Sequence, residues 1–214
     1  MERRAMEDAQ EIRGETGLDP NPSHAYFQHV ICTLVEEKSK VLDLGCGSGD
    51  LLHLLQAQKR VEGTGVEVSE EMVYHCVQKG LSVHHGDVDA GLVDFPDSCF
   101  DYVILHDTLQ EVKKPDWVIR EMLRVGKRGI ITFPNFGYWR ARTQVFFYGR
   151  TPVIPTLPYK WFETPNLHFL SINDFVRFCE TRRIEIVESR FASGGASVRW
   201  LPNLFAESAL FVVT

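Results

Sequence analysis

The sequence VLDLGCGSGD at positions 41–50 restricts the possible fold more than any other segment of this chain. An apolar run ends at Asp43 and opens into a loop with three alternating glycines, and leucines then follow at helical spacing. Glycines in such a loop let a ligand approach the backbone and reach the amino end of the next helix. The segment therefore predicts a strand, a ligand-binding loop and a helix, in that order.

The residue after the third glycine limits the kind of ligand. The dinucleotide fingerprint G-x-G-x-x-G would need glycine at position 50, where this chain has Asp50. A carboxylate there would repel a pyrophosphate, so a cofactor without phosphate fits better. S-adenosylmethionine (SAM) is such a cofactor, and Asp43 would attract its ammonium group.

Two further predicted strands end in residues that suit a nucleoside. Glu67 lies in strand 61–68, 18 residues beyond Gly49, which is about where one carboxylate accepts from both hydroxyls of a ribose. Asp87 follows strand 81–85, and its carboxylate suits the adenine amino group while Val88 packs on the ring. Both positions therefore favour a cofactor that contains a nucleoside, as the glycine loop does.

The next strand, 100–105, is followed directly by His106 and Asp107, where open parallel sheets bind their ligands. We treat both as candidate catalytic residues, with His106 as a candidate base. The candidate cofactor site comprises Asp43, Gly45, Cys46, Gly47, Gly49, Glu67, Val68, Asp87, Val88 and His106. Each carboxylate taken alone could equally be a helix cap or a loop residue, and only the series favours a site.

Composition bounds the class of protein. The chain has 214 residues, 44% hydrophobic and 24% charged, which suits one α/β domain with an elaboration. The net charge of -6 argues against nucleic-acid binding, and no apolar run is long enough to cross a membrane. Five scattered cysteines predict a cytoplasmic protein with reduced thiols. Nothing around His84 and His85 has metal-ligand spacing, so we expect no metal.

The order of elements predicts a doubly wound, mostly parallel sheet of seven strands. Residues 1–22 form a charged N-terminal arm that ends in prolines, and residues 23–214 form the SAM-binding domain. A helix capped by Ser23 is expected over residues 23–37. The last two strands, 183–187 and 209–213, have no crossover helix after them and should form an antiparallel hairpin at the sheet edge.

An insertion at about residues 134–170 does not belong to the minimal doubly wound fold. Residues 133–169 hold 11 of the 24 aromatic residues and five of the ten prolines. A segment this aromatic should be ordered. It either closes over the cofactor edge as a lid, presents a partner surface with aromatic and arginine anchors, or simply covers the end of the sheet.

Motifs in the second half of the chain resemble the methionine biosynthesis protein MetW family, within the class I SAM-dependent methyltransferase fold. They are DYVIL (101–105), TLQ (108–110), EMLRVG (121–126), FPNFGYWR (133–140), GRTPV (149–153), LPYKWFETPNLH (157–168) and DF (174–175). The resemblance implies a SAM-binding protein of bacterial methionine synthesis that supports homoserine O-acetyltransferase. It places Asp43 and the loop glycines at the methionine and ribose end, Glu67 at the diol, and Asp87 and Val88 at the adenine.

Two functions therefore stay open. One is an accessory or regulatory protein that acts through the acetyltransferase and senses SAM. The other is a methyltransferase for a small-molecule acceptor, with Tyr138, Trp139, Tyr159 and Trp161 as walls of an acceptor pocket. An NAD-dependent oxidoreductase is disfavoured because Asp50 would meet the pyrophosphate.

Overall fold

The computed structural model describes residues 22–214, so the predicted N-terminal arm lies outside the described residues apart from Pro22. Pro22 is the first residue of helix α2 (Pro22–Leu34). The sequence had placed Ser23 as the cap of this helix, but Ser23 lies inside it and is buried. Proline suits the first helical turn because the N–H that it lacks has no partner there.

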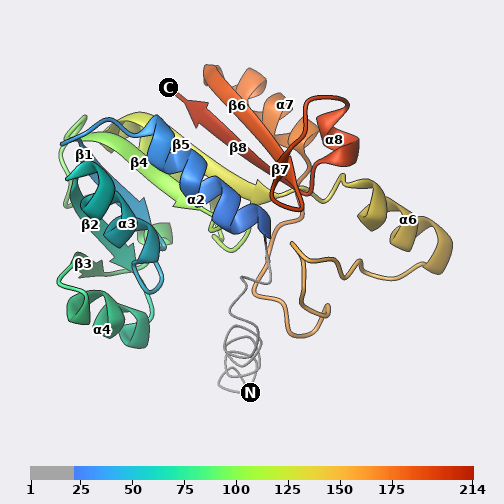
Figure 1. Ribbon diagram of the computed structural model, residues 1–214, viewed down its shortest axis with the longest axis horizontal. Coiled ribbons are helices and arrows are strands. Elements are labelled where there is room, and N and C mark those ends of the chain that lie inside the picture. The colour runs from blue at the N-terminus through green and yellow to red at the C-terminus, as the bar shows by residue number, and fades with distance from the viewer. Residues whose placement is uncertain (1–21) are drawn as a thin grey trace.

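Within residues 22–214 the strands form a single sheet of eight, one more than predicted (Figure 1). Its strands are β1 (Lys40–Leu44), β2 (Glu62–Glu67), β3 (Ser82–His85), β4 (Phe100–His106), β5 (Gly126–Pro134), β6 (Ile186–Ser193), β7 (Ala196–Ser197) and β8 (Ser208–Val213). Their order is β3-β2-β1-β4-β5-β8-β6-β7, and β1 to β5 are parallel. The additional strand is β7, which has only two residues and pairs with the end of β6.

The predicted antiparallel pair of the last two long strands at one edge of the sheet is confirmed, and only the two-residue β7 lies beyond it. Strand β8 is the inner strand of this pair, because it lies between β5 and β6 and is antiparallel to both. All six residues of β8 are buried, whereas in β6 only Ala192 is buried and the other residues are partly buried or exposed. A strand that is apolar on both faces gains most from an interior position, which explains why β8 takes it.

Helices cover both faces of the sheet. On one face α2 and α3 (Asp50–Lys59) pack through Phe27, Ile31, Leu52 and Leu55, while Cys76 of α4 (Glu70–Gln78) joins the same core. On the other face lie α5 (Pro115–Val125) and α7 (Ile172–Arg182). The short elements η1 (Val88–Ala90) and α8 (Pro202–Phe205) complete the fold. Among residues 22–214 no helix has the length and apolarity needed to span a membrane.

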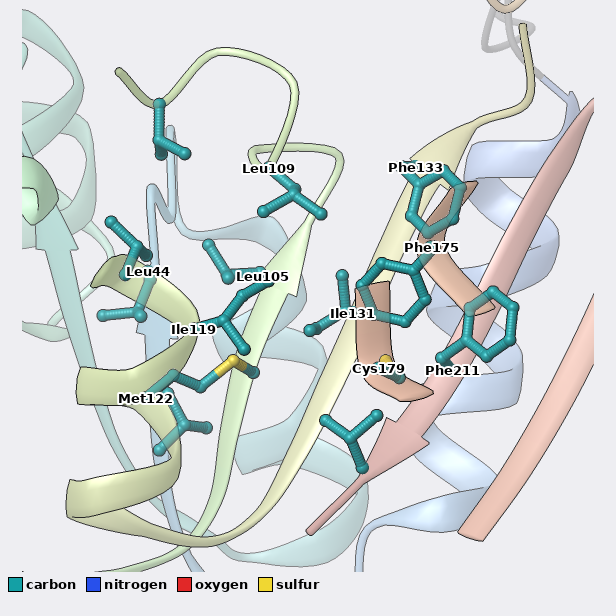
Figure 2. Close-up of a cluster of buried hydrophobic side chains, with 14 of the residues drawn as sticks. Leu44, Leu105, Leu109, Ile119, Met122, Ile131, Phe133, Phe175, Cys179 and Phe211 are labelled. Atoms are coloured by element: carbon teal, nitrogen blue, oxygen red, sulfur yellow. The ribbon is translucent and has the colours of Figure 1, made fainter. Parts of the chain in front are cut away.

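Three phenylalanines join the second half of the sheet to α7 (Figure 2). The rings of Phe133 in β5 and Phe211 in β8 stack with centroids 5.8 Å apart and an interplanar angle of 8°. Phe175 of α7 packs on both, at 5.2 Å from Phe133 and 4.7 Å from Phe211. The cluster fixes the strand end from which residues 134–170 depart.

Residues 134–170 contain one helix, α6 (Trp139–Tyr148), followed by an irregular segment. A small separate core of Tyr138, Ala141, Ile154 and Leu157 holds the start of this helix. Many other aromatic side chains of the segment are exposed, which argues against the simple role of covering the end of the sheet. Figure 1 shows α6 projecting from the sheet, on the side away from β3.

Candidate functional site

The glycine loop joins β1 to α3 at the carboxyl edge of the parallel strands, as predicted. Gly45, Gly47 and Gly49 have φ angles of 72°, 53° and 78°, a region that side-chain-bearing residues rarely adopt. A Cβ on Gly49 would also lie 2.3 Å from Leu81 Cδ1, whereas one on Gly47 would meet nothing within 4 Å. The loop is therefore packed at its base and open above Gly47, where a ligand can approach the backbone.

Glu67 fastens this loop to the end of β2. Its Oε2 accepts a hydrogen bond from the backbone N–H of Gly47 at 2.9 Å, and its Oε1 accepts from Val68 and Ser69 at 2.8 Å each. The side chain is buried, with a relative exposure of 8%. Because a carboxylate has about four lone-pair positions, three backbone donors leave little of its accepting capacity unused. Glu67 thus organises the loop in addition to any contact with a ligand.

Asp43 lies beside this arrangement, near the end of β1, and is almost fully buried. Burial raises the pKa of its carboxyl group to about 7; the charge of Glu67 adds to this effect and His24 opposes it. The group therefore exchanges its proton near neutral pH. A cation that binds next to Asp43 would favour the ionised form.

Cys46 faces the protein interior, where its sulfur lies 3.9 Å from that of Cys76 in α4. A Cβ on Gly65 would lie 2.4 Å from the Cys46 sulfur, so glycine at position 65 makes room for this thiol. Burial and the nearby charge of Asp43 raise the pKa of the Cys46 thiol. A thiol that resists ionisation is a poor nucleophile, which agrees with a packing role.

The two residues predicted at the adenine end of the site both make contacts within the protein. Asp87 Oδ1 accepts from the backbone N–H of Asp89 at 2.9 Å and so caps η1, as an ordinary capping residue does. Val88 packs partly against the main core, whereas Val68 is largely exposed. The role of Asp87 and Val88 towards adenine stays a prediction, as does the place of Val68 in the cofactor site.

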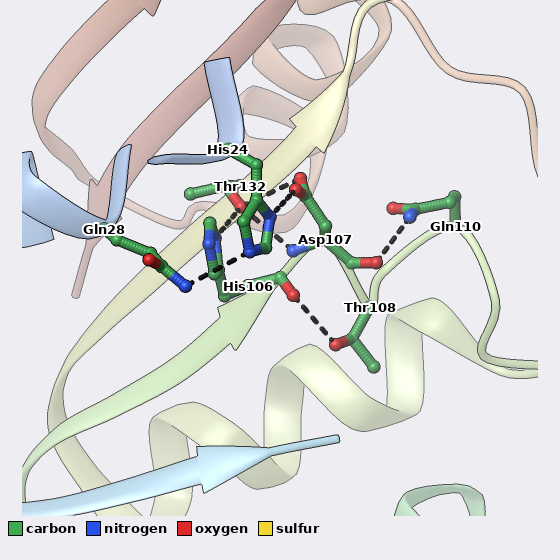
Figure 3. A network of polar contacts seen from close by, with 7 residues as sticks. All are labelled: His24, Gln28, His106, Asp107, Thr108, Gln110 and Thr132. Atoms are coloured by element: carbon green, nitrogen blue, oxygen red, sulfur yellow. Dashed lines mark hydrogen bonds and ion pairs between the residues drawn. The ribbon is translucent and has the colours of Figure 1, made fainter. Parts of the chain in front are cut away.

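The end of β4 carries a hydrogen-bonded network that includes a residue the sequence analysis did not predict (Figure 3). His24 of α2 lies with Nδ1 2.8 Å from Asp107 Oδ2, and its ring stacks on that of His106 with centroids 4.2 Å apart. His106 Nδ1 lies 2.7 Å from Thr132 Oγ1, and this hydroxyl lies 3.1 Å from Asp107 Oδ1. The two predicted residues thus share one network with His24 and Thr132.

Asp107 has an unusual backbone conformation and a lowered pKa. Its φ of 55° is left-handed, which costs a residue other than glycine about 1–3 kcal/mol and is frequent at functional sites. Burial acts to raise the pKa of Asp107, but the hydrogen bond to His24, the charge of His106 and the contact with Thr132 lower it below its usual value. An ionised Asp107 orients the His24 ring, so that Nδ1 donates to the carboxylate and Nε2 accepts from the amide of Gln28.

Within residues 22–214, one group has the residue types of a metal site: His24, His106 and Asp107 have ligand atoms within 4.8 Å of one another. The imidazole planes are stacked and 24° apart, so the in-plane lone pairs of the two rings run side by side. Metal ligation requires those lone pairs to converge on one point. The geometry therefore favours a carboxylate–imidazole pair over a metal centre.

Only part of this network can be predicted from the sequence. Thr132 pairs in register with His106 across β4 and β5, so an alignment of the two strands would have found it. His24 lies more than 80 residues from Asp107 in the chain, and it belongs to a helix whose pattern shows only an apolar face. Gln28, one turn further along α2, holds the other ring nitrogen of His24 at 3.2 Å. No local motif marks either residue.

Comparison with solved structures shows the same fold. A SAM-dependent methyltransferase of Thermotoga maritima, a possible histamine N-methyltransferase, matches with a TM-score of 0.64 and 16% identity over 90% of each chain. A putative methyltransferase of Haloferax volcanii, solved in complex with the activator Trm112, matches with a TM-score of 0.65 and 18% identity over 89% of each chain. At these identities the likeness concerns the class I methyltransferase fold alone.

Sequence comparison gives a narrower result. The chain is 40% identical over 153 residues to the bifunctional methionine biosynthesis protein MetXA/MetW of Rhodopirellula baltica, a match that covers 67% of this chain and 25% of the relative. The chain thus spans about a quarter of that relative. A demethylmenaquinone methyltransferase of Listeria welshimeri is 27% identical over 184 residues, or 76% of this chain and 77% of the relative.

The family model described as methionine biosynthesis protein MetW matches residues 25–213, which include nearly all of the described structure. The match contains the glycine loop, Glu67, the network around Asp107 and the whole of residues 134–170. His24 lies one residue outside it. On this evidence the chain belongs to the MetW family of methionine biosynthesis proteins.

Proposed function

We propose that this protein binds SAM at the glycine loop and supports homoserine O-acetyltransferase by direct association. The observation that carries the proposal is the relative from Rhodopirellula baltica, in which MetXA and MetW are parts of one polypeptide. Fusion keeps two parts at a high effective concentration, which favours even a weak contact between them. Separate chains need an interface of their own to achieve the same association.

SAM fits the chemistry of the loop. The open space above Gly47 admits a ligand to the backbone, Asp43 offers a carboxylate to an ammonium group, and Glu67 lies where a ribose diol would bind. Val68, Asp87, Val88 and His106 complete the proposed site. The structural neighbours include SAM-dependent methyltransferases of the same fold, which supports this cofactor over a dinucleotide.

The raised pKa of Asp43 predicts that SAM affinity depends on pH. An ammonium group beside Asp43 favours the ionised carboxylate, so binding releases a proton and affinity increases with pH up to the pKa of about 7. We expect affinity to increase about eightfold from pH 6 to pH 7.5, the increase in the ionised fraction. Titration calorimetry measures it, and in Asp43→Asn this dependence should vanish. A wild-type affinity that is flat with pH would contradict the role of Asp43.

SAM is made from methionine, the product of the pathway that the acetyltransferase feeds. If SAM changes the affinity of this protein for the acetyltransferase, the acetyltransferase must change the affinity for SAM by the same factor. Binding of the two purified proteins, measured with and without SAM, tests both the association and this coupling. Absence of binding under both conditions would refute the proposed function.

A second candidate is methyl transfer to a small-molecule acceptor, which the His24–Asp107 pair favours. SAM supplies an electrophilic methyl group with a neutral thioether as leaving group. An acceptor X–H would form the new X–C bond as the methyl–sulfur bond breaks. His24 Nε2 would exchange its hydrogen bond from Gln28 for the acceptor proton, while Asp107 stabilises the imidazolium. S-adenosylhomocysteine release with amino-acid, acetylated and aromatic acceptors tests this. Equal release by His24→Gln would exclude His24 as the base.

A further inference from the structure

The last turn of α6 carries an aromatic cluster that the domain leaves uncovered. The side chains of Phe146, Phe147 and Tyr148 are 82%, 71% and 74% exposed, and we call these three residues the α6 patch. Consecutive residues of a helix point about 100° apart, so three in a row surround most of its circumference. A helix that packs on its domain buries at least one of them. The end of α6 is therefore free of the domain on nearly all sides.

The patch is presented by an anchored base. Asn135, fully buried, accepts from the backbone N–H groups of Gly137 and Ile172, at 3.0 and 3.2 Å, and so ties together the two ends of the insertion. It also donates to the carbonyl oxygens of Asn203 and Ala206. Of the helix itself only Ala141 is buried. The first half of α6 is thus fixed to the domain, and the second half extends outwards (Figure 1).

The exposed area has the size of an interface core. If a free aromatic side chain offers about 200 Å², the three rings expose roughly 450 Å² together. A stable interface buries about 800 Å² on each partner, with aromatic residues at its centre and a polar rim. The largest apolar patch of a typical monomer is of about this size and is often functional.

The charge of the segment that carries the patch indicates the kind of partner. Residues 134–170 contain four basic residues and one acidic residue, a net charge of +3 in a chain of net charge -6. Arg140, Arg150 and Lys160 are exposed, and none of them forms an ion pair with another residue in the described part of the chain. A symmetric contact between two copies would bring like-charged patches together, which is unfavourable. The surface suits a different protein with an apolar cleft and an acidic rim.

We propose that the acetyltransferase docks on the α6 patch. The aromatic end of α6 inserts into an apolar cleft of that enzyme, and the cleft has an acidic rim. This inference rests on the proposed function, because the fused MetXA/MetW relative is what identifies the partner. Aromatic side chains at the centre of an interface carry most of its binding energy, and the basic rim speeds association and selects the partner.

The test compares binding of the purified acetyltransferase to wild type and to a Phe146→Ala/Phe147→Ala double variant by titration calorimetry. Removal of two exposed rings leaves the fold intact, so melting temperature and SAM affinity should not change. We expect the double variant to bind the enzyme at least about thirtyfold more weakly. Two single variants serve as matched controls: Tyr74→Ala on α4 and Trp200→Ala near α8 each remove an equally exposed ring and should bind as wild type does.

Each outcome separates the inference from the proposed function. Binding by wild type together with unchanged binding by the double variant would overturn the docking site and leave the association standing. No binding by wild type would refute the association itself, and the inference with it. If the double variant instead loses self-association, as seen by light scattering, the patch binds a second copy of this chain and our proposal is wrong. If it loses sedimentation with phosphatidylglycerol vesicles, the patch binds a membrane and our proposal is equally wrong.

Discussion

Replacing Glu67 by alanine is expected to weaken SAM binding about 150-fold, which corresponds to about 3 kcal/mol. Two losses combine in this variant. The ribose diol loses the proposed acceptor, and the backbone N–H groups of Gly47, Val68 and Ser69 lose the carboxylate that holds them. Without these hydrogen bonds the glycine loop must become ordered when SAM binds, and this ordering makes the free energy of binding less favourable.

The conservative variant Glu67→Gln separates the two losses. Its amide oxygen can still accept from Val68 and Ser69, but its NH2 group would meet the N–H of Gly47, and two donors cannot bond. We therefore expect an intermediate loss of affinity, measured by calorimetry, while circular dichroism confirms that both variants fold. Wild-type affinity in the alanine variant would show that SAM does not bind at this loop.

Replacing Phe211 by alanine should lower the free energy of unfolding by about 3–5 kcal/mol, the range for a large buried aromatic residue. The ring is 1% exposed, stacks on Phe133 and packs against Phe175, so its removal leaves a cavity between β5, β8 and α7. The rigid neighbours, themselves buried rings, cannot fill this space. Urea unfolding followed by circular dichroism gives the value.

Phe146→Ala is the matched control, because it deletes the same side chain from an exposed position. We expect it to change stability by less than about 0.5 kcal/mol. Phe211→Leu, which keeps much of the volume, should fall between the two. A loss below about 1 kcal/mol in Phe211→Ala would mean that the cluster does not hold β8 in the sheet interior.

Local patterns predicted most of the parallel half of the fold. The apolar runs, the glycine loop and the helical leucine spacing predicted β1 and α3, and Glu67 indeed ends β2. Local patterns could not show which of the last two long strands would be the inner one, because that choice depends on which neighbours cover both apolar faces of β8. The two-residue β7 carries too few residues for any period to be detected.

The residues at the glycine loop could be predicted from the sequence more fully than those around Asp107. Asp43, Glu67 and the glycines follow directly from strand ends, and Glu67 accepts a hydrogen bond from the loop at Gly47. His24 was not predictable, because α2 brings it to Asp107 only after the whole sheet has formed. Likewise, aromatic composition identified residues 134–170 as unusual but could not tell buried rings such as Tyr138 from exposed ones such as Phe146.

The fold by itself does not decide between accessory and catalytic roles. One architecture can serve many different chemistries, so the role must be decided at the site. The proposed site does connect to the proposed interface. Thr132, which bonds to His106 and Asp107, lies in β5, and the chain continues from it through Asn135 into α6.

The most direct test of the account is the rate of homoserine acetylation by the acetyltransferase of the same organism, measured with and without this protein at low and saturating SAM. We predict that the protein changes the rate and that SAM alters the size of the change. Asp43→Asn should retain the association but respond less to SAM. An acetylation rate that is the same with and without the protein at every SAM concentration would contradict the accessory role, and methyl transfer through His24 and Asp107 would then be the leading explanation.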